Sequence, residues 1–471
     1  MDKCGQLWTK LYNKMEEKDF YSIDEIAAHL SVSVKSIRRL VASGELVSIK
    51  VGGSYRISKE DLSNYIQSLR NERKVNFDLL GNPLLDEYSE TKSQELREKD
   101  GEVSGRKKGA PRRKNIDTQT YSAMNKDIVN WADITPEWKN PSHSDMTFVD
   151  LFCGAGGLSK GLELSGLHGI CGLDFFKEAG QTYQRNFNHP FVYGDITLQE
   201  NKEKFYSTVK EQLDGRHLNI VAGGFPCQGF SMAGNRIVDD PRNSLYKEML
   251  EIVKNLQPDF VICENVKGLR SMLNGAVERK IIEDYKAIGY EMNVTTLCAA
   301  DYYTPQKRER VIFIGNRIGV KNYHPQPILS PKDYITTGQA IGDLINHPED
   351  PAFNHVPTKH SAEMEKRIIE CPEGQSLYKG YSDAWKKCPW DEASCTIKEN
   401  HGGVNVHPKL PRVLTAREMA RLQSFPDDFI FEGKKNKQLV QIGNAVPCLL
   451  GKAIGLAVRF SAGDLQTNKE K

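Results

Sequence analysis

Cys227 occupies a position where a nucleophile could act. It stands in the segment GGFPCQGFS (223–231), directly after the apolar run 219–222, which predicts a buried strand. A loop at the carboxyl end of a strand is where open α/β sheets place their sites. A cysteine there is a strong nucleophile at neutral pH if nearby charge or dipoles favour the thiolate. A loop cysteine alone is more often inert, so the neighbouring segments decide its interpretation.

A carboxyl group and a pair of arginines occupy similar positions. Glu264 follows the apolar run 260–263, so its carboxyl group should lie at the carboxyl end of the next strand. Between apolar neighbours it could hold a proton near pH 7 and act as a general acid. Arg308 and Arg310 precede the apolar run 311–314 and should lie on one side of an extended chain. Alternate arginines can hold an anionic or carbonyl group by forked hydrogen bonds.

The segment CGAGGLS (153–159) predicts a site for a nucleotide-like cofactor. It joins the strand-like run 148–152 to a helical pattern, so backbone N–H groups at the start of the helix can approach a ligand closely. Asp174 ends a second strand-like run, where it could accept hydrogen bonds from ribose hydroxyls. A site for a nicotinamide dinucleotide is the alternative prediction. The sequence pattern of such sites is G-x-G-x-x-G, and Ser159 stands in place of its third glycine. A purely structural turn is the remaining alternative.

The hydrophobic pattern of the chain predicts the fold that positions these segments. Across 146–462, short apolar runs that could be buried on both faces alternate with helical patterns, which is typical of a largely parallel α/β sheet. A length of 471 residues suggests two or three domains. We expect a DNA-binding domain at 18–72, a charged linker at 73–145 and the α/β domain at 146–462. The linker contains RKKGAPRRK (106–114), which is either simply solvated or makes nonspecific phosphate contacts.

The overall composition excludes several classes of protein but does not indicate the binding partner. The 64 Lys and Arg against 62 Asp and Glu give a net charge of +2, which neither demands nor forbids a polyanion. We expect no membrane span, because no run of eighteen apolar residues occurs, and no cleaved signal peptide. The ten cysteines form no C-x-x-C and show no zinc spacing, so we expect reduced thiols in a cytoplasm and no metal.

The N-terminal domain is predicted to bind DNA. A capping box at Ser22 opens a helix, a second helix should span about 34–42, and 47–57 reads as a hairpin around two glycines. This order resembles the small winged helix-turn-helix of excisionase and MerR-type regulators. Such modules often pair on two-fold sites, which leaves a homodimer open, and a module used only for docking is the alternative. The residues expected to contact DNA are Lys35, Arg38, Arg39 and Arg56.

The α/β domain as a whole resembles the cytosine-C5 DNA methyltransferases. Six segments match in family order: 148–157, 223–231, 264–266, 306–310, 412–429 and 443–447. The resemblance implies a Rossmann-like S-adenosylmethionine-dependent methyltransferase fold with a small target-recognition region at about 317–395. One departure is Tyr303, where the family usually has glycine. The nearby His355, His360, His401 and His407 lack metal-ligand spacing, so we expect them to face solvent or DNA.

The resemblance also implies a reaction, the transfer of a methyl group to C5 of cytosine in duplex DNA. Cys227 would add to C6 while Glu264 protonates N3, which makes C5 nucleophilic. Arg310 would hold the cytosine O2, and Arg308 would support the site or the thiolate. The base must be flipped out of the duplex, and the loop 228–242 should cover it.

The cofactor implied by the resemblance is S-adenosylmethionine. Its adenine would stack on the aromatic residue before the glycine turn, its methionine end would lie on that turn, and two residues near the C-terminus would close the pocket. The residues assigned to this site are Phe152, Gly154, Gly156, Gly157, Asp174, Phe175, Asp195, Ile196, Asn444 and Val446.

The resemblance finally implies a biological role. A bacterial, cytoplasmic modification enzyme would protect double-stranded DNA from a restriction endonuclease that shares its target site. The helix-turn-helix would also let it repress its own gene. Methylation of RNA, as in the tRNA-directed branch of the fold, is an alternative that the DNA-type recognition insert disfavours. A regulator with an inactive methylase half is another, which the complete catalytic set disfavours.

Overall fold

The computed structural model describes 20–29, 37, 40–41, 46–51, 54–58, 60–62, 76–77, 83–84, 128–129, 138, 141–226, 232–233, 236–237, 244–378, 385–398 and 405–465. The chain divides into two compact units, Met1–Asn115 and Ile116–Lys471, each of which is described by itself.

The second unit is built on a seven-stranded sheet with the order β14-β15-β13-β10-β7-β8-β9. Only β15 runs antiparallel to its neighbours, so six strands end at the same edge. The strands are β7 (Thr147–Leu151), β8 (His168–Asp174), β9 (Phe191–Tyr193), β10 (Ile220–Gly223), β13 (Phe260–Val266), β14 (Glu291–Cys298) and β15 (Glu309–Asn316). The expected largely parallel sheet is confirmed, and the apolar run at 311–314 belongs to its antiparallel strand.

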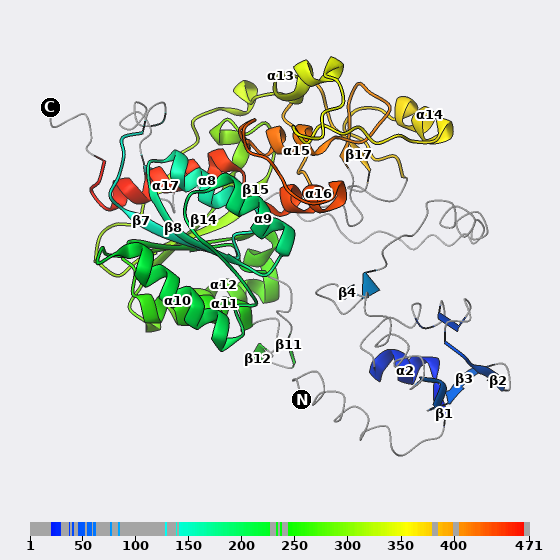
Figure 1. Cartoon of the computed structure of the whole chain (residues 1–471), viewed down its shortest axis with the longest axis horizontal. Helices are drawn as coiled ribbons and strands as arrows, with labels where there is room; N and C mark the ends of the chain where they lie inside the picture. The colour runs from blue at the N-terminus through cyan, green and yellow to red at the C-terminus, as the bar shows by residue number, and fades with distance from the viewer. Residues whose placement is uncertain are drawn as a thin grey trace. The chain divides into compact units, whose positions relative to one another are not determined.

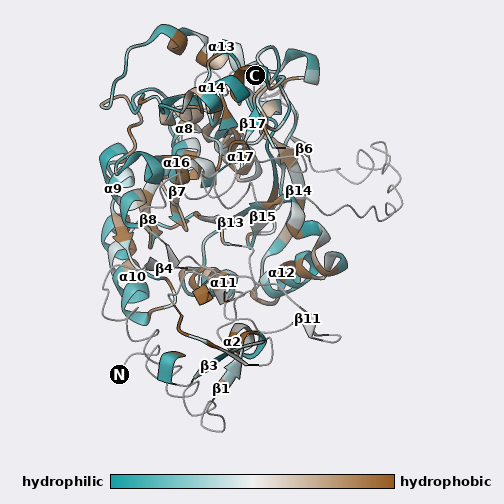
Figure 2. Cartoon of the chain, turned by 90° about the vertical axis from the view of Figure 1, so that its right-hand side faces the viewer, coloured by the Kyte–Doolittle hydropathy of each residue, from teal (hydrophilic) through white to brown (hydrophobic). Residues whose placement is uncertain are grey.

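Helices cover both faces of the sheet (Figure 1). On one face lie α8 (Gly157–Leu164), α9 (Lys177–Asn186) and α17 (Cys448–Ser461); on the other lie α10 (Gln199–Leu213), α11 (Ser244–Leu256) and α12 (Ala276–Ala287). Alternate strand residues feed two separate cores, with Val149 and Val221 on the α10–α12 face and Phe148 and Ile220 on the α8–α17 face. The helix α10 turns a largely hydrophilic surface outward (Figure 2). This is the predicted Rossmann-like architecture.

The helices α8 and α17 pack at unusually close range through glycines. A Cβ on Gly161 would lie 2.4 Å from the carbonyl oxygen of Cys448 and 2.6 Å from the Cα of Gly451. The stretch Lys435–Ser461 is apolar and long enough to cross a membrane, but 78% of its most apolar window is buried. Its hydrophobicity is therefore that of a core element, which carries the C-terminal segment back to the glycine turn.

A smaller region follows the sheet and lies beside the α8–α17 face (Figure 1). It is held by an apolar cluster that includes Ile341, Ile397 and Leu422. Its elements are η4 (Pro331–Asp333), α13 (Thr337–Ile341), η5 (Gly342–Asn346), α14 (Ala362–Glu370), β17 (Lys386–Lys387), β18 (Asn405–Val406), α15 (Ala416–Leu422) and α16 (Lys435–Asn444). The remaining described elements of this unit are β6 (Ile128–Val129), β11 (Met232–Ala233), β12 (Arg236–Ile237), η2 (Lys267–Gly275), η3 (Ala299–Tyr302) and β16 (His324–Pro325).

The first unit contains the sheet β1-β3-β2, all antiparallel, and the helix α2, and its described residues 37, 40–41 and 60–62 are helical as well. Ser22 and Glu25 cap the helix reciprocally, with Ser22 N–H donating to Glu25 and Glu25 N–H donating to Ser22 Oγ. The predicted capping box and hairpin are thus present, and β1 is an additional strand. The elements are β1 (Phe20–Ser22), α2 (Ile23–His29), β2 (Ile49–Val51), β3 (Ser54–Ser58), β4 (Asn76–Phe77) and β5 (Pro83–Leu84).

Candidate active site

Glu264 and Arg310 form an ion pair at the edge where the parallel strands end. In the antiparallel pair β13–β15, Val266 lies opposite Arg310, which brings the arginine within reach of Glu264 two residues away. Arg310 Nε lies 2.8 Å from Glu264 Oε1, and the two side chains are only 12% and 13% exposed. Two of the four predicted catalytic residues are therefore in direct contact.

The segment that carries Cys227 begins beside this ion pair. The strand β10 lies next to β13, and a Cβ on Gly224 would lie 3.0 Å from Glu264 Oε2. The side-chain amide of Asn265 donates to the carbonyl oxygen of Phe225 at 2.8 Å, which ties the two segments together. Cys227 itself lies outside the described residues, as does most of the predicted covering loop 228–242, of which β11 and β12 pair antiparallel.

Arg308 is buried and bonds to backbone rather than to the edge. Its Nη1 donates to Ile397 O at 2.9 Å, and its Nη2 donates to Gly443 O at 2.9 Å and Ala445 O at 3.1 Å. The side chain is 2% exposed, and burial, with the charge of Arg310, lowers the pKa of the guanidinium. Arg308 thus connects three segments that are far apart in sequence, in agreement with a supporting role.

Gln306 has a similar role, which the sequence did not reveal. Its Oε1 accepts from the N–H of Ile397 at 2.8 Å, and its Nε2 donates to Leu422 O at 3.0 Å and Gln423 Oε1 at 2.8 Å. The side chain is completely buried. The sequence offered one indication of this role: Gln306 lies two residues before Arg308, in the segment 306–310 that matches the family. Together Gln306 and Arg308 fix the loop that leads into β15.

The glycine turn has the tight geometry expected of a cofactor loop. Gly154 and Gly156 have φ of +53° and +93°, which glycine adopts without strain. A Cβ on Gly157 would lie 2.3 Å from the carbonyl oxygen of Val446, so the turn touches the C-terminal segment directly. Phe152, just before the turn, has φ +55° and is half-buried. The two ends predicted to form one pocket therefore meet.

Asp174 holds the turn in place. Its carboxylate accepts from the N–H of Gly154 and from the N–H of Phe176, both at 2.8 Å. It is 9% exposed, and burial raises its pKa against the effect of these bonds. Phe175 beside it is 50% exposed at the same edge, which leaves its ring free to stack on a base.

The other predicted cofactor residues differ in exposure. Asp195 is exposed, and its Oδ1 accepts from the N–H of Thr197 at 2.9 Å. Ile196 is 3% exposed and packs in the core, so its side chain offers little surface to a ligand. Asn444 is exposed at the end of α16, while Val446 is 7% exposed.

A buried polar chain lies beneath the turn. Ser159 Oγ donates to Asp150 Oδ2 at 2.6 Å and lies 2.9 Å from the hydroxyl of Tyr183, which lies 2.7 Å from His189 Nε2. Burial raises the pKa of Asp150 to about 7 and lowers that of His189 to about 4. Ser159, which breaks the dinucleotide fingerprint, thus uses its hydroxyl to join α8 to β7.

Comparison with known proteins identifies the larger unit. The model of the C-5 cytosine-specific DNA methylases matches residues 146–459, two thirds of the chain. The chain belongs to this family. A helix-turn-helix domain model matches 20–70. The predicted resemblance, fold class and enzyme class, a DNA cytosine-C5 methyltransferase, are confirmed, and members of the family use S-adenosylmethionine as methyl donor.

Individual relatives support this assignment of the methylase. It is 36% identical over 329 residues to the type II methyltransferase M1.HphI of Haemophilus parahaemolyticus, covering 66% of this chain and 86% of that one. It is 32% identical over 385 residues to M.BspRI of Lysinibacillus sphaericus, covering 68% and 83%. A solved structure described as a prophage-encoded DNA modification methyltransferase from E. coli superposes with a TM-score of 0.56 at 24% identity, covering 68% and 100%.

The histidines of the methylase's smaller region correct one expectation. His355 and His407 are 1% and 0% exposed, so they face neither solvent nor DNA. His407 Nδ1 accepts from the N–H groups of Lys409 and Leu410, and His355 Nδ1 bonds to the hydroxyl of Thr415 at 3.1 Å. The expectation was wrong because a buried imidazole can bond to nearby backbone donors, as in His407, or to a side chain distant in sequence, as in His355, and neither contact shows in the spacing. His360 is half-buried, and His401 lies outside the described residues.

An ion pair organises the same region. Arg412 donates to both oxygens of Glu418, at 2.8 and 2.7 Å, and the N–H of Thr415 donates to Glu418 as part of a capping box. The described part of the methylase contains no group of three His, Cys, Asp or Glu side chains placed to hold a metal.

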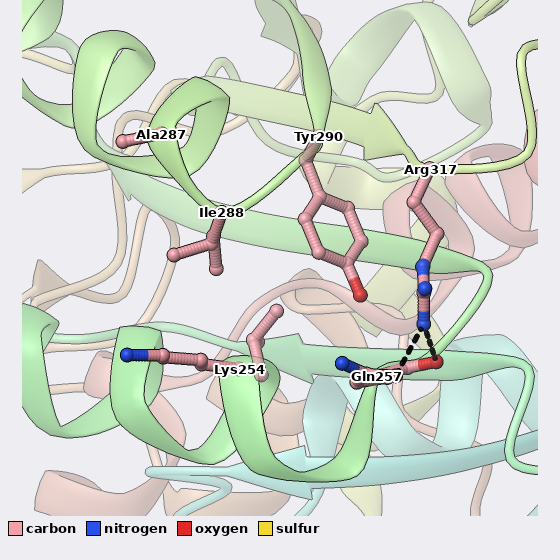
Figure 3. Close-up of a pocket in the computed structure, with 7 residues that line it drawn as sticks. Lys254, Gln257, Ala287, Ile288, Tyr290 and Arg317 are labelled. Carbon is pink, nitrogen blue, oxygen red and sulfur yellow. Dashed lines mark hydrogen bonds between the residues drawn. The ribbon is translucent and has the colours of Figure 1, made fainter.

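A shallow pocket of about 290 Å³ lies at the opposite edge of the sheet and contains no predicted site residue. Lys254, Gln257, Tyr290 and Arg317 line it, with Arg317 directed toward Gln257 (Figure 3). It forms at the strand ends remote from Glu264, so it is not part of the candidate active site.

The predicted DNA contacts of the first unit are described only in part. Arg56 is half-exposed on β3, opposite Ile49 of the hairpin. Lys35, Arg38 and Arg39 lie outside the described residues.

Replacing His407 by Gln should make the stability of the methylase less dependent on pH. Burial lowers the pKa of His407 to about 4, whereas an unfolded histidine titrates near 6.5. Below pH 6.5 the unfolded chain binds a proton that the folded chain excludes. The free energy of unfolding of wild type is therefore about 2 kcal/mol lower at pH 5 than at neutral pH because of this residue. Glutamine can still accept the two backbone bonds.

Urea unfolding at pH 7.5 and pH 5 measures this effect. The advantage of wild type over His407→Gln should shrink on going to pH 5. An advantage that stays constant or grows would show that His407 is not held neutral by burial.

Proposed function

We propose that this protein is the modification methyltransferase of a type II restriction system and that it methylates C5 of a cytosine in duplex DNA. The observation that carries the proposal is the Glu264–Arg310 ion pair beside the segment of Cys227, at the edge that also holds the glycine turn. Relatives named type II methyltransferases support the restriction role. The cognate endonuclease would share the target sequence without having to bind this chain, in a bacterial cytoplasm.

Cys227 is the nucleophile in this proposal. C5 of cytosine is too weak a nucleophile to attack an alkyl group directly, and addition of a thiolate to C6 gives C5 enamine character. Glu264 is the carboxylate partner of Arg310, and after taking up a proton from solvent it can deliver that proton to ring N3 as the electron pair moves into the ring. Once C5 carries the methyl group, its proton is lost to solvent, the freed electron pair expels Cys227 as a thiolate, and N3 returns its proton to Glu264, so the aromatic ring and the enzyme are regenerated.

The two arginines have separate tasks. Arg310 lies at the edge, and its guanidinium has donors beyond those used on Glu264 and on its neighbour's carbonyl group, so it can hold the cytosine O2. Arg308 touches no substrate and holds the loop, the recognition region and the C-terminal segment in register.

The residues at the turn fit S-adenosylmethionine, which supplies an electrophilic methyl group when bound. Gly156 and Gly157 let the turn pack against Phe187 and Val446, whereas the space beside Gly154 is open to a ligand. Asp174 retains acceptor capacity for ribose hydroxyls beside the exposed ring of Phe175. We assign the adenine to Phe152, Asp195 and the backbone at Ile196, and the closing side of the pocket to Asn444 and Val446.

The target base must leave the duplex to reach this edge, at a cost of a few kcal/mol. We propose that the loop 228–242 covers the flipped base and excludes water from the covalent adduct. Methylation of RNA by the same machinery is the alternative, and the DNA methylase match over 146–459 favours DNA.

Replacing Cys227 by Ala should lower methyl transfer to duplex DNA by at least about 10³-fold, because the covalent route is lost. The measurement is incorporation of labelled methyl from S-adenosylmethionine into duplex DNA and, in parallel, into tRNA. Cys371→Ala is the matched control, since Cys371 lies at the end of α14 and its described bonds go to the carbonyl groups of Pro372 and Gln375.

Wild type should label DNA and not tRNA, and bisulfite sequencing should place the methyl groups on one cytosine within a fixed sequence. Label in tRNA alone would establish the RNA alternative. Equal and negligible transfer by wild type and Cys227→Ala, with promoter binding retained, would establish an inactive regulator.

A second role, repression of its own gene, is favoured by the helix-turn-helix match over 20–70. Lys35, Arg38 and Arg39 would enter the major groove and Arg56 would contact phosphate, with a homodimer on a two-fold operator. Deleting residues 1–72 should abolish binding to the promoter fragment and raise expression of a reporter. Unchanged binding and expression would contradict this role.

A further inference from the structure

Tyr303 has a backbone conformation that a bulky side chain adopts only with support. It follows η3 with φ +62° and ψ +6°, in the left-handed region that favours glycine. For an L-residue this conformation is unfavourable because the Cβ lies too close to the following carbonyl group. Its ring is 37% exposed, so the core does not enclose it. Another contact must therefore stabilise the left-handed conformation of Tyr303.

Trp138 provides that contact from the segment that precedes the methylase. Its ring stacks on Tyr303 with centroids 5.8 Å apart and planes inclined by 26°. On α17, the ammonium of Lys452 lies 4.9 Å from the Trp138 ring centroid and donates to the Trp138 carbonyl oxygen. Lys452 is only 9% exposed, so this anchor is part of the packed domain.

A second contact holds the same segment nearby. The strand β6 pairs parallel with β16, so Ile128 and Val129 lie beside His324 and Pro325. The hydroxyl of Tyr302, the neighbour of Tyr303, donates to Pro325 O at 2.8 Å. The segment is therefore attached at two places around η3.

The turn at Tyr303 leads directly into the loop that carries Arg308 and Arg310. Thr304 and Gln306, which follow it, are completely buried. The N–H of Ala299 donates to Arg308 O at 2.9 Å and closes the loop just before Arg310. A change of backbone direction at Tyr303 would shift every one of these residues.

We propose that Trp138 is a positioning residue for methyl transfer, which holds Tyr303 in its left-handed conformation and so keeps Arg308 and Arg310 in place. The inference rests on the function proposed above. It makes the connecting segment part of the enzyme, although the family match begins only at residue 146.

Four full-length variants test the proposal by kcat at saturating S-adenosylmethionine and a long, unmethylated duplex DNA of mixed sequence. Trp138→Ala should lower kcat by roughly five- to thirtyfold, the range that loss of support for a left-handed residue predicts. Trp138→Phe, which keeps a stacking ring, should stay within about twofold of wild type. Tyr303→Gly should also stay near wild type, because glycine needs no support.

The decisive variant is Trp138→Ala/Tyr303→Gly, which should recover most of the activity lost in Trp138→Ala. A general loss of packing would not be rescued in this way. Wild-type kcat in Trp138→Ala, or no recovery in the double variant, would overturn the proposal.

Failure of the proposed function gives a different result, namely no transfer by wild type to any DNA. Unfolding temperatures then test the conformational claim alone. Trp138→Ala should lower the unfolding temperature less in the Tyr303→Gly background than in wild type, and equal decreases would contradict the claim.

Discussion

The buried guanidinium of Arg308 is the contact on which the site depends. A charge removed from water needs several hydrogen-bond partners, and here they come from Ile397, Gly443 and Ala445. These acceptors lie in two segments, the stretch around Ile397 and the end of α16 at Gly443 and Ala445, next to Val446, whose carbonyl oxygen contacts the glycine turn. Arg308 therefore ties both segments to the loop that leads into β15, and Gln423 Nε2 supports the same junction by donating to Ala445 O at 3.3 Å.

This constraint links binding to catalysis. The C-terminal segment touches the turn through Val446 O, and Asp174 ties that turn to the end of β8. On the other side, the loop of Arg308 continues into β15, where Arg310 meets Glu264. The proposed donor pocket and the proposed catalytic edge thus lie at opposite ends of one buried network, and the sheet supplies the rigid base for both.

The sequence predicted what depends on local pattern and less of what depends on distant contacts. Apolar runs buried on both faces were recognised as strands, but such runs look alike in parallel and antiparallel strands, so the direction of β15 could not be read. Glu264 and Arg310 were assigned from their places beside strands. The partners of Gln306 lie about a hundred residues away and leave no local signal. Trp138 lies in a stretch predicted as linker, and its role depends on the conformation of Tyr303.

The central claim is that Arg308 holds the site together whereas Arg310 acts on the substrate. Its most direct test is the affinity for S-adenosylmethionine, measured by calorimetry on Arg308→Lys and Arg310→Ala. A lysine keeps the charge but cannot reach three carbonyl groups in different directions. We expect Arg308→Lys to weaken S-adenosylmethionine binding by at least about tenfold. We expect Arg310→Ala to bind it within about threefold of wild type while methyl transfer is lost. Unchanged binding in Arg308→Lys, or equal weakening in both variants, would contradict the account.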